Sequence, residues 1–365
     1  MSPAAPGPGT PAAAETPRVS RAKAVRHTIE YGIFRALMWL IESVPLRVSE
    51  ALVRGLADTA FALGRNRRRI AIDNILQCGI TADPREAAAI ARRSFRNFAL
   101  LILESFRADR MLDGDNWRQH VDVRIDPEAQ AILDAPARGV IVATGHLGSW
   151  EMAARAVSHS KPVAGVARRM NNPKVEAWLQ RRKSNAAFYQ IPKYDKRNLG
   201  RFLSILKQGH VLAIMIDQHA SWGGVRVPFF GRPAYTYTTL PLLHLVTGAP
   251  LCFGYCRRIG PLRYEVRVEG PIRCKRTGNK EEDIRKILED VSRRLENAIR
   301  QSPDQYLWGH RRWKEQQHRL AQDPLPAAPG GTPTHAPGPP PPSEEAPSGT
   351  ASRRGDIAGG TGNPG

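Results

Sequence analysis

The chain has 365 residues and a formal net charge of +20. This excess predicts an anionic partner, namely nucleic acid, an anionic membrane surface or an acidic protein, although a well-solvated surface is the plainer interpretation. The four cysteines, Cys78, Cys252, Cys256 and Cys274, match no zinc-ligand spacing. We therefore expect buried, reduced thiols and no disulfide framework.

Both ends of the chain are poor in apolar anchors. Residues 1–18 are rich in Pro, Ala and Gly and show no apolar core of a secretory signal, and residues 321–365 are rich in Pro, Gly and Ser. Such segments bury too little apolar surface to offset the entropy of ordering, so we predict that both are disordered. No internal Pro/Gly linker divides the remainder, which predicts a single domain over residues 19–320.

The first ordered segment is predicted to be an amphipathic helix at about residues 27–45. Its apolar side chains recur at helical spacing at Phe34, Leu37, Met38 and Ile41. Arg35 and Glu42 interrupt the stretch, which is shorter than the roughly 18 apolar residues of a membrane span. Two interpretations stay open: a helix that lies in a membrane interface, with basic residues before it, or a helix packed on the core.

The following segments alternate between helix and strand. Helices are predicted at 48–63 and 84–112, then at 152–157, 172–186, 199–207, 238–246 and 281–300. Strands are predicted at 139–144, 162–168, 211–216, 251–257 and 264–268. This order predicts an α/β fold in which a mostly parallel central sheet is flanked by helices. Ligands gather at the carboxyl ends of strands in such sheets, and both His146 and Asp217 fall there.

His146 and Glu151 stand at the turn between the strand at 139–144 and the helix that follows. An imidazole can take a proton from an attacking hydroxyl, and a carboxylate can fix its tautomer and support its positive charge. A five-residue offset puts two side chains on different faces of a helix. The pair therefore meets only if His146 lies in the loop and Glu151 in the first helical turn.

Residues 139–151 resemble the His-x4-acid block of the lipid A biosynthesis acyltransferases of the lauroyl/myristoyl type, within the lysophospholipid and glycerolipid acyltransferase group. The resemblance covers roughly residues 25–318. Further blocks follow in the family's order at 168–169, 217–218, 227–231, 247–250 and 305–314. The resemblance implies transfer of a fatty acyl group from acyl carrier protein, or from coenzyme A, to a hydroxyl of a membrane glycolipid, a lipid A precursor. It implies no cofactor beyond the acyl thioester and no nucleic-acid partner.

By this resemblance, His146 is the base that deprotonates the acceptor hydroxyl, and Glu151 orients it. Backbone N–H groups near Gly145 and Gly148, or an arginine, could stabilise the oxyanion. Direct transfer needs no enzyme nucleophile. Ser149 is the alternative, but the residues around it lack the second glycine of a nucleophile elbow.

The expected substrate contacts follow the later blocks. Arg168 and Arg169 suit acceptor phosphates, or alternatively an ion pair with a local carboxylate. Asp217 could bind sugar hydroxyls, position Arg168 or cap a turn. An apolar wall for the acyl chain, or else a core packing loop, is expected at Phe229, Phe230 and Gly231. His210 and His219 flank the strand before Asp217 without the spacing of a metal site, so we expect no metal.

The resemblance and the charge place the enzyme at the cytoplasmic face of a bacterial inner membrane, as a peripheral or single-helix-anchored protein. One rival is the same chemistry on another glycolipid, such as a phosphatidylinositol mannoside. A second is a non-enzymatic, basic nucleic-acid-binding protein. That rival predicts basic residues interleaved with stacking aromatics, whereas the arginines here adjoin apolar helices.

Overall fold

The structure is a computed structural model of the chain. It describes residues 20–111, 116–183, 188–193, 197–221 and 223–313. All the described residues belong to one compact unit of the chain. The two segments that we predict to be disordered, 1–18 and 321–365, lie outside the described residues.

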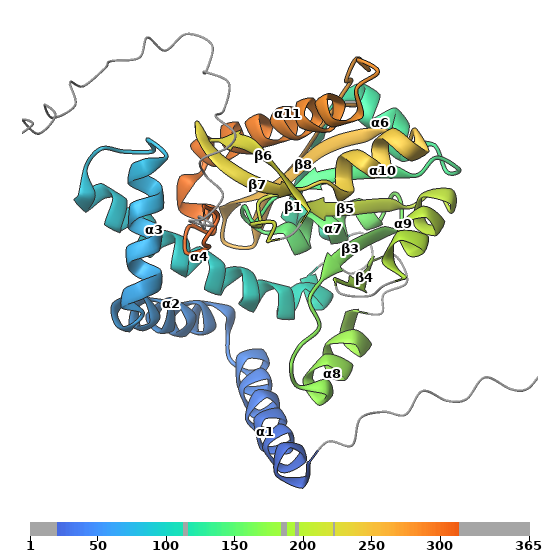
Figure 1. Cartoon of the computed structure of the whole chain (residues 1–365). Helices are drawn as coiled ribbons and strands as arrows, with labels where there is room; N and C mark the ends of the chain where they lie inside the picture. The colour runs from blue at the N-terminus through green and yellow to red at the C-terminus, as the bar shows by residue number, and fades with distance from the viewer. Residues whose placement is uncertain (1–19, 112–115, 184–187, 194–196, 222, 314–365) are drawn as a thin grey trace, which may run out of the picture. The chain divides into compact units, whose positions relative to one another are not determined.

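A seven-stranded sheet in the order β1-β9-β8-β2-β5-β3-β4 forms the centre of this unit (Figure 1). Its strands are β1 Val121–Ile125, β2 Val140–Thr144, β3 Val163–Ala167, β4 Phe188–Pro192, β5 Val211–Met215, β8 Leu251–Gly260 and β9 Arg263–Glu269. From β8 to β4 all neighbours are parallel, whereas β9 is antiparallel to β8 and parallel to β1. The mostly parallel α/β sheet predicted from the sequence is confirmed.

Helices cover both faces of the sheet, and a separate hydrophobic core lies on each face. On one face, α9 (Asn198–Lys207), α10 (Thr239–Thr247) and α11 (Lys280–Gln301) share a core with a hairpin of β6 (Gly224–Phe229) and β7 (Arg232–Tyr237). On the other face, α6 (Pro127–Asp134) and α7 (Trp150–Ser158) share a second core. Because strand β2 contributes to both cores, nearly all of its side chains are apolar and buried or half-buried.

Helices also fill the chain before the sheet. They are α1 Arg21–Ser43, α2 Leu46–Leu63, α3 Arg65–Gln77, α4 Pro84–Met111 and the short α5 Trp117–His120. Helix α4 packs on α2, α3 and α7, and α1 packs on α8 (Pro173–Lys183). The amphipathic helix predicted at 27–45 is thus present as α1. Within the described ranges, we find no helix with the length and apolarity that crossing a membrane requires.

Several elements escaped the sequence analysis. Strand β1 buries only its first residue, so it shows no alternation of apolar and polar side chains. Residues 227–231, expected to form a loop, include the end of β6 and its tight turn, in which Phe230 has a φ of 53° and Gly231 a φ of 68°. A short 3₁₀ helix, η1, follows α11 and spans Pro303–Gln305.

Candidate active site

The side chain of His146 is held by Asp217. The Nδ1 of His146 lies 2.8 Å from Oδ1 of Asp217, and the backbone N–H of His146 donates to Oδ2 at 2.7 Å. The two residues follow β2 and β5, which are parallel neighbours, so their carboxyl ends meet at one edge of the sheet. An N–H at Nδ1 directed at the carboxylate leaves Nε2 as the proton acceptor. His146 keeps 17% of its side chain exposed, whereas Asp217 is buried.

The loop that carries His146 is fixed by backbone hydrogen bonds. Leu307 N–H donates to the carbonyl of His146 at 3.1 Å, and Gly148 N–H donates to the carbonyl of Gln305 at 3.0 Å. Gly148 has a φ of 58°, and a Cβ there would lie 1.9 Å from the carbonyl oxygen of Cys256. Only glycine fits this position without moving the backbone. The N–H of Gly148 is therefore already engaged, which speaks against our expectation that it serves the oxyanion.

Asp217 is ionised in spite of its burial. Burial by itself raises the pKa of this carboxyl, but the charge and hydrogen bonds of His146, together with the nearby Arg312, outweigh it and lower the pKa to about 2. The buried phenol of Tyr306 adjoins the same carboxylate, and its own pKa is raised well above 10.0, by burial first and then by Asp217. Asp217 is thus a fixed negative charge directed at His146.

Arg312 connects the segment after Asp217 to the neighbouring β6–β7 hairpin. It is buried, donates to the carbonyls of Gln218 and Tyr235 at 3.2 and 2.5 Å, and donates to Thr236 Oγ1 at 2.6 Å. Its guanidinium therefore joins the residue after Asp217 to the β6–β7 hairpin. The sequence analysis did not identify this role, nor the bracing of the His146 loop by residues 305–307.

Glu151 lies where the sequence predicts, in the first turn of α7, but its recorded pairing differs from the expected one. Its buried carboxylate lies 3.3 Å from Nη2 of Arg155, one turn along the same helix. The carboxylate that hydrogen-bonds His146 is that of Asp217. Asp217 thus makes the Nδ1 contact of an orienting carboxylate, and the orienting role of Glu151 stays a prediction.

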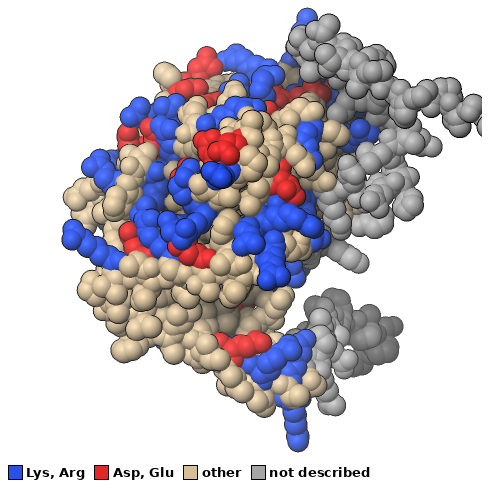
Figure 2. Space-filling view, turned by 90° about the vertical axis from the view of Figure 1, so that its left-hand side faces the viewer, with Lys and Arg blue, Asp and Glu red and all other residues tan. Residues whose placement is uncertain are grey.

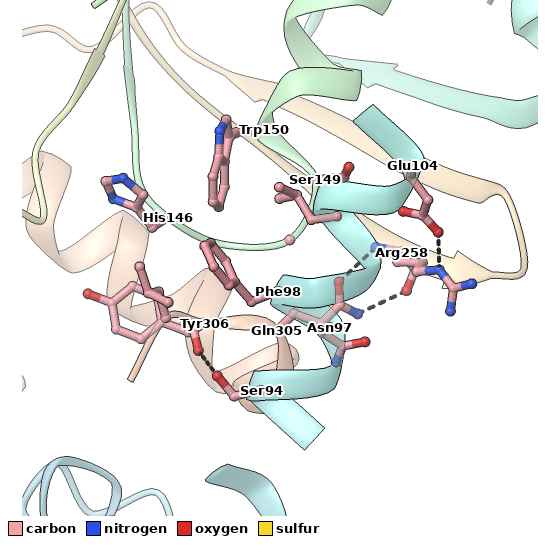
Figure 3. Close-up of a pocket in the computed structure, with 13 residues that line it drawn as sticks. Ser94, Asn97, Phe98, Glu104, His146, Ser149, Trp150, Arg258, Gln305 and Tyr306 are labelled. Carbon is pink, nitrogen blue, oxygen red and sulfur yellow. Dashed lines mark hydrogen bonds and ion pairs between the residues drawn. The ribbon is translucent and has the colours of Figure 1, made fainter. Parts of the chain in front are cut away.

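Ser149 is placed away from the imidazole. In Figure 3 the rings of Trp150 and Phe98 lie between His146 and Ser149, which sits on the side of Glu104. Trp150 meets the His146 ring edge-on, with 5.0 Å between ring centroids. Ser149 is buried, and its N–H donates to the carbonyl of Cys256 at 3.0 Å. This geometry favours direct transfer over an acyl-enzyme on Ser149.

An apolar cavity of about 130 Å³ lies between the sheet and α7. Holding a single water takes only roughly 10–15 Å³, so this space is far larger than a packing defect. Small side chains open it: Gly165 on β3, Ala213 on β5, and Ala153 and Ala154 on α7 line the cavity. Thr144 and Trp150 line it as well, and they flank His146 in the sequence. Trp150 therefore touches both the cavity and the imidazole, whereas His146 itself does not line the cavity.

The aromatic pair Phe229 and Phe230 belongs to the other face of the sheet. Both side chains are buried in the core that α11 shares with the hairpin, and Phe229 stacks on Trp313 at 5.7 Å. Neither they nor Gly231 line the apolar cavity. Of our two interpretations, core packing is the one that the structure shows.

Arg168 and Arg169 directly follow β3 and are exposed. The guanidinium of Arg168 donates a hydrogen bond to Oδ1 of Asn171 at 3.5 Å. It therefore contacts a side-chain amide here, whereas one of our expectations was that Asp217 positions it. Lys193, which follows β4, donates to the side chain of Gln218, and both burial and the charge of Arg168 lower its pKa. Basic side chains thus gather at the carboxyl ends of β3 and β4. Lys193 was missed because β4 was not predicted.

The histidines considered for a metal do not converge. Nδ1 of His210 lies 2.9 Å from the hydroxyl of Tyr189, and the ring of His219 packs against Tyr235. Among the described residues, no group of three or more His, Cys, Asp or Glu side chains could hold a metal ion. The cysteines are free, and burial raises the pKa of Cys78 to about 12 and that of Cys252 to about 11.

An imidazole hydrogen-bonded to a buried carboxylate, at the carboxyl edge of a mostly parallel sheet, is an arrangement suited to acid–base catalysis. The model of the family described as bacterial lipid A biosynthesis acyltransferase matches residues 18–315. The chain belongs to this family and is an O-acyltransferase.

Curated relatives agree with the family. The chain is 25% identical over 287 residues to a lipid A biosynthesis lauroyltransferase of Escherichia coli K12, covering 76% of this chain and 89% of the relative. It is 26% identical over 285 residues to a lipid A biosynthesis palmitoleoyltransferase of the same strain, with the same coverage. A lipid A biosynthesis acyltransferase of Shigella flexneri matches equally well.

Proposed function

We propose that this enzyme transfers a fatty acyl group from an acyl thioester, carried by acyl carrier protein, to a hydroxyl of a lipid A precursor. The observation that carries the proposal is the His146–Asp217 pair, because a carboxylate that accepts from Nδ1 directs Nε2 of His146 to act as the proton acceptor. Trp150 connects this imidazole to the apolar cavity. The names of the curated relatives support the acceptor class.

In this proposal, Nε2 of His146 takes the proton of the acceptor hydroxyl as its oxygen attacks the thioester carbonyl. The tetrahedral intermediate then expels the thiolate, and the imidazolium returns the proton to it, so that an ester and a free thiol are formed. Asp217 supports the imidazolium, since a carboxylate with a pKa of about 2 stays charged throughout. Glu151 is assigned a positioning role through its ion pair with Arg155.

The cavity beneath α7 supports the proposal that the acyl chain lies between this helix and the sheet. Its lining is mostly Val and Ala side chains, which suits a methylene chain and offers few polar groups to desolvate. The thioester carbonyl then lies at the Trp150 end, next to His146.

The acceptor would approach from the exposed edge of the sheet. Its phosphates would meet Arg168, Arg169 and Lys193, since fixed cations compensate the charge that a phosphate brings to the site. The positive surface would attract both an anionic membrane and an acidic carrier protein. We assign the enzyme to the cytoplasmic face of a bacterial inner membrane, bound at its surface, and no cofactor beyond the acyl donor.

The test is product analysis by mass spectrometry. Purified enzyme is incubated with a lipid A precursor and, in separate reactions, with acyl carrier protein thioesters or coenzyme A thioesters of several chain lengths. The expected product is the precursor with one added acyl group, formed fastest from the carrier-protein donor. Absence of any acylated product with either donor would refute the proposed acceptor.

A further inference from the structure

Helix α2 carries an apolar stripe on its outward side in addition to the apolar side that packs on α4, where Phe61 contacts Phe95. Its outward stripe is apolar: Leu52 is 52% exposed and Leu56 64% exposed, and Val48 and Leu63 are exposed as well. Val48, Leu52 and Leu56 are spaced by four residues and so lie on one face. The exposed positions between them are small, at Ala51, Gly55, Thr59 and Ala60. A helix that faces water ordinarily carries apolar side chains only on the side turned toward the core.

Two acidic side chains of α2, Asp58 and Glu50, face α4 and β8 and help to hold the helix in place. Asp58 accepts hydrogen bonds from Arg92 at 2.8 Å and from Arg96 at 2.7 Å, both on α4. At the other end of α2, Glu50 accepts from Arg258 at 3.0 Å. The hydrogen bonds and charges of Arg96 and Arg92 lower the pKa of Asp58 well below its ordinary value. The orientation of α2 is therefore fixed by its polar contacts, which leave the apolar stripe outside.

Arginines border this apolar face. Arg47 lies at the start of α2, and Arg65, Arg67 and Arg69 follow its end on α3; all are exposed. Figure 2 looks at the side of the molecule that carries α2 and α3 and shows a broad uncharged surface with basic side chains above it. Helix α1 continues the pattern, since Ile29, Ile33, Leu37 and Trp39 are exposed along it.

A second copy of the chain would bring one arginine border against another, and the like charges would repel. An anionic lipid monolayer satisfies both features at once, because its acyl layer accepts the leucines and its headgroups accept the arginines. We propose that α2 lies in the plane of an anionic monolayer, with Val48, Leu52, Leu56 and Leu63 in the apolar layer. The inference deepens the proposed function, since it rests on an acceptor held in a membrane.

The test is flotation with vesicles of phosphatidylcholine and phosphatidylglycerol that contain neither acyl donor nor acceptor. The double variant Leu52→Gln/Leu56→Gln removes two apolar side chains without a cost in helix propensity. Its matched control is Leu199→Gln/Val246→Gln, since these residues are 62% and 73% exposed on α9 and α10. We expect the α2 variant to lose about tenfold or more in its vesicle partition coefficient, and the control to match the wild type. Equal flotation of the α2 variant and the wild type would overturn the inference.

A second measurement reports insertion directly. An environment-sensitive fluorophore is attached at Leu56→Cys in a Cys274→Ser background, since the other cysteines are buried. Its emission should shift to the blue on vesicle addition, whereas the same dye at Leu199→Cys should not respond. A blue shift at Leu56→Cys without vesicles that rises with protein concentration would assign the face to a second copy and overturn the inference.

The failure of this inference is separable from that of the proposed function. Acyl transfer to a detergent-dispersed lipid A precursor does not need the monolayer, so the α2 double variant should keep the wild-type rate there. A wild-type enzyme that floats normally but forms no product would refute the acyl transfer and leave the lipid surface standing.

Discussion

At the scale of single residues, the hydrogen bond between Nδ1 of His146 and the carboxylate of Asp217 is the central contact of the proposed site. His146 follows strand β2 and Asp217 follows strand β5. Because these two strands are parallel, both residues lie at the same edge of the sheet. Which carboxylate would meet the imidazole could not be predicted, since residues 146 and 217 are 71 positions apart and only the strand order makes them neighbours. Glu151, close in sequence, was the natural candidate, but its side chain lies beside Arg155.

Asp217→Asn should therefore impair catalysis. An amide carries no charge to support the imidazolium and can hydrogen-bond the unwanted tautomer, so kcat should fall by about 10²- to 10⁴-fold with a smaller change in KM. Because the pKa of Asp217 is about 2, the carboxylate is ionised above that pH and adds no titration step near neutrality. Steady-state kinetics from pH 6 to 9 check this. A variant with wild-type kcat would show that Asp217 does not act through His146.

At the scale of elements, the sequence pattern was enough to predict long helices and strands that are buried on both faces of the sheet. Helices α2, α4 and α11 and strands β2 and β5 lie within a few residues of their predicted bounds. Among the missed elements, β1 and β4 sit at the two edges of the sheet, where few side chains are buried and the pattern is weak. The cavity could not be predicted either, because it arises from small residues on separate strands that only the register aligns, such as Gly165 beside Ala213.

Gly165 on β3 offers a test of the acyl-chain cavity. A Cβ at this position would lie 3.6 Å from the ring of Phe188, so a side chain can be added without displacing the backbone. Gly165→Met should fill the cavity and lower the rate with the longest accepted donor by about tenfold or more, while shorter donors lose less. Competition among thioesters of different length, read by mass spectrometry, measures this shift.

The control for this variant is Gly200→Met on α9, where nothing lies within 4 Å of an added Cβ. It should leave the chain-length preference unchanged. An unchanged preference in Gly165→Met as well would remove the acyl chain from this cavity.

At the scale of the whole molecule, the charge was informative about partners but not about fold. A net charge of +20 is compatible with a nucleic acid, an anionic lipid or an acidic protein as the partner. Membership of the lipid A acyltransferase family favours a lipid among these partners. The family match ends at residue 315, and the recorded contacts of the site involve residues before that point. The chemistry therefore belongs to the part of the chain that the family shares.

Removal of residues 321–365 should accordingly leave acyl transfer intact. We expect kcat and the melting temperature of the shortened chain to match the full chain, with kcat within about twofold. Parallel kinetics and thermal melts of the two proteins check this. A large loss of kcat at an unchanged melting temperature would assign the tail a part in turnover.

The most direct test of the proposed chemistry is the turnover of His146→Gln compared with that of His244→Gln. His244 lies on α10, and its imidazole hydrogen-bonds the backbone carbonyl of Ala249. With both variants shown to be folded by their thermal melts, acyl transfer to the lipid A precursor should fall by about 10²- to 10⁴-fold in His146→Gln only. Near-wild-type transfer by folded His146→Gln would contradict the assignment of His146 as the base.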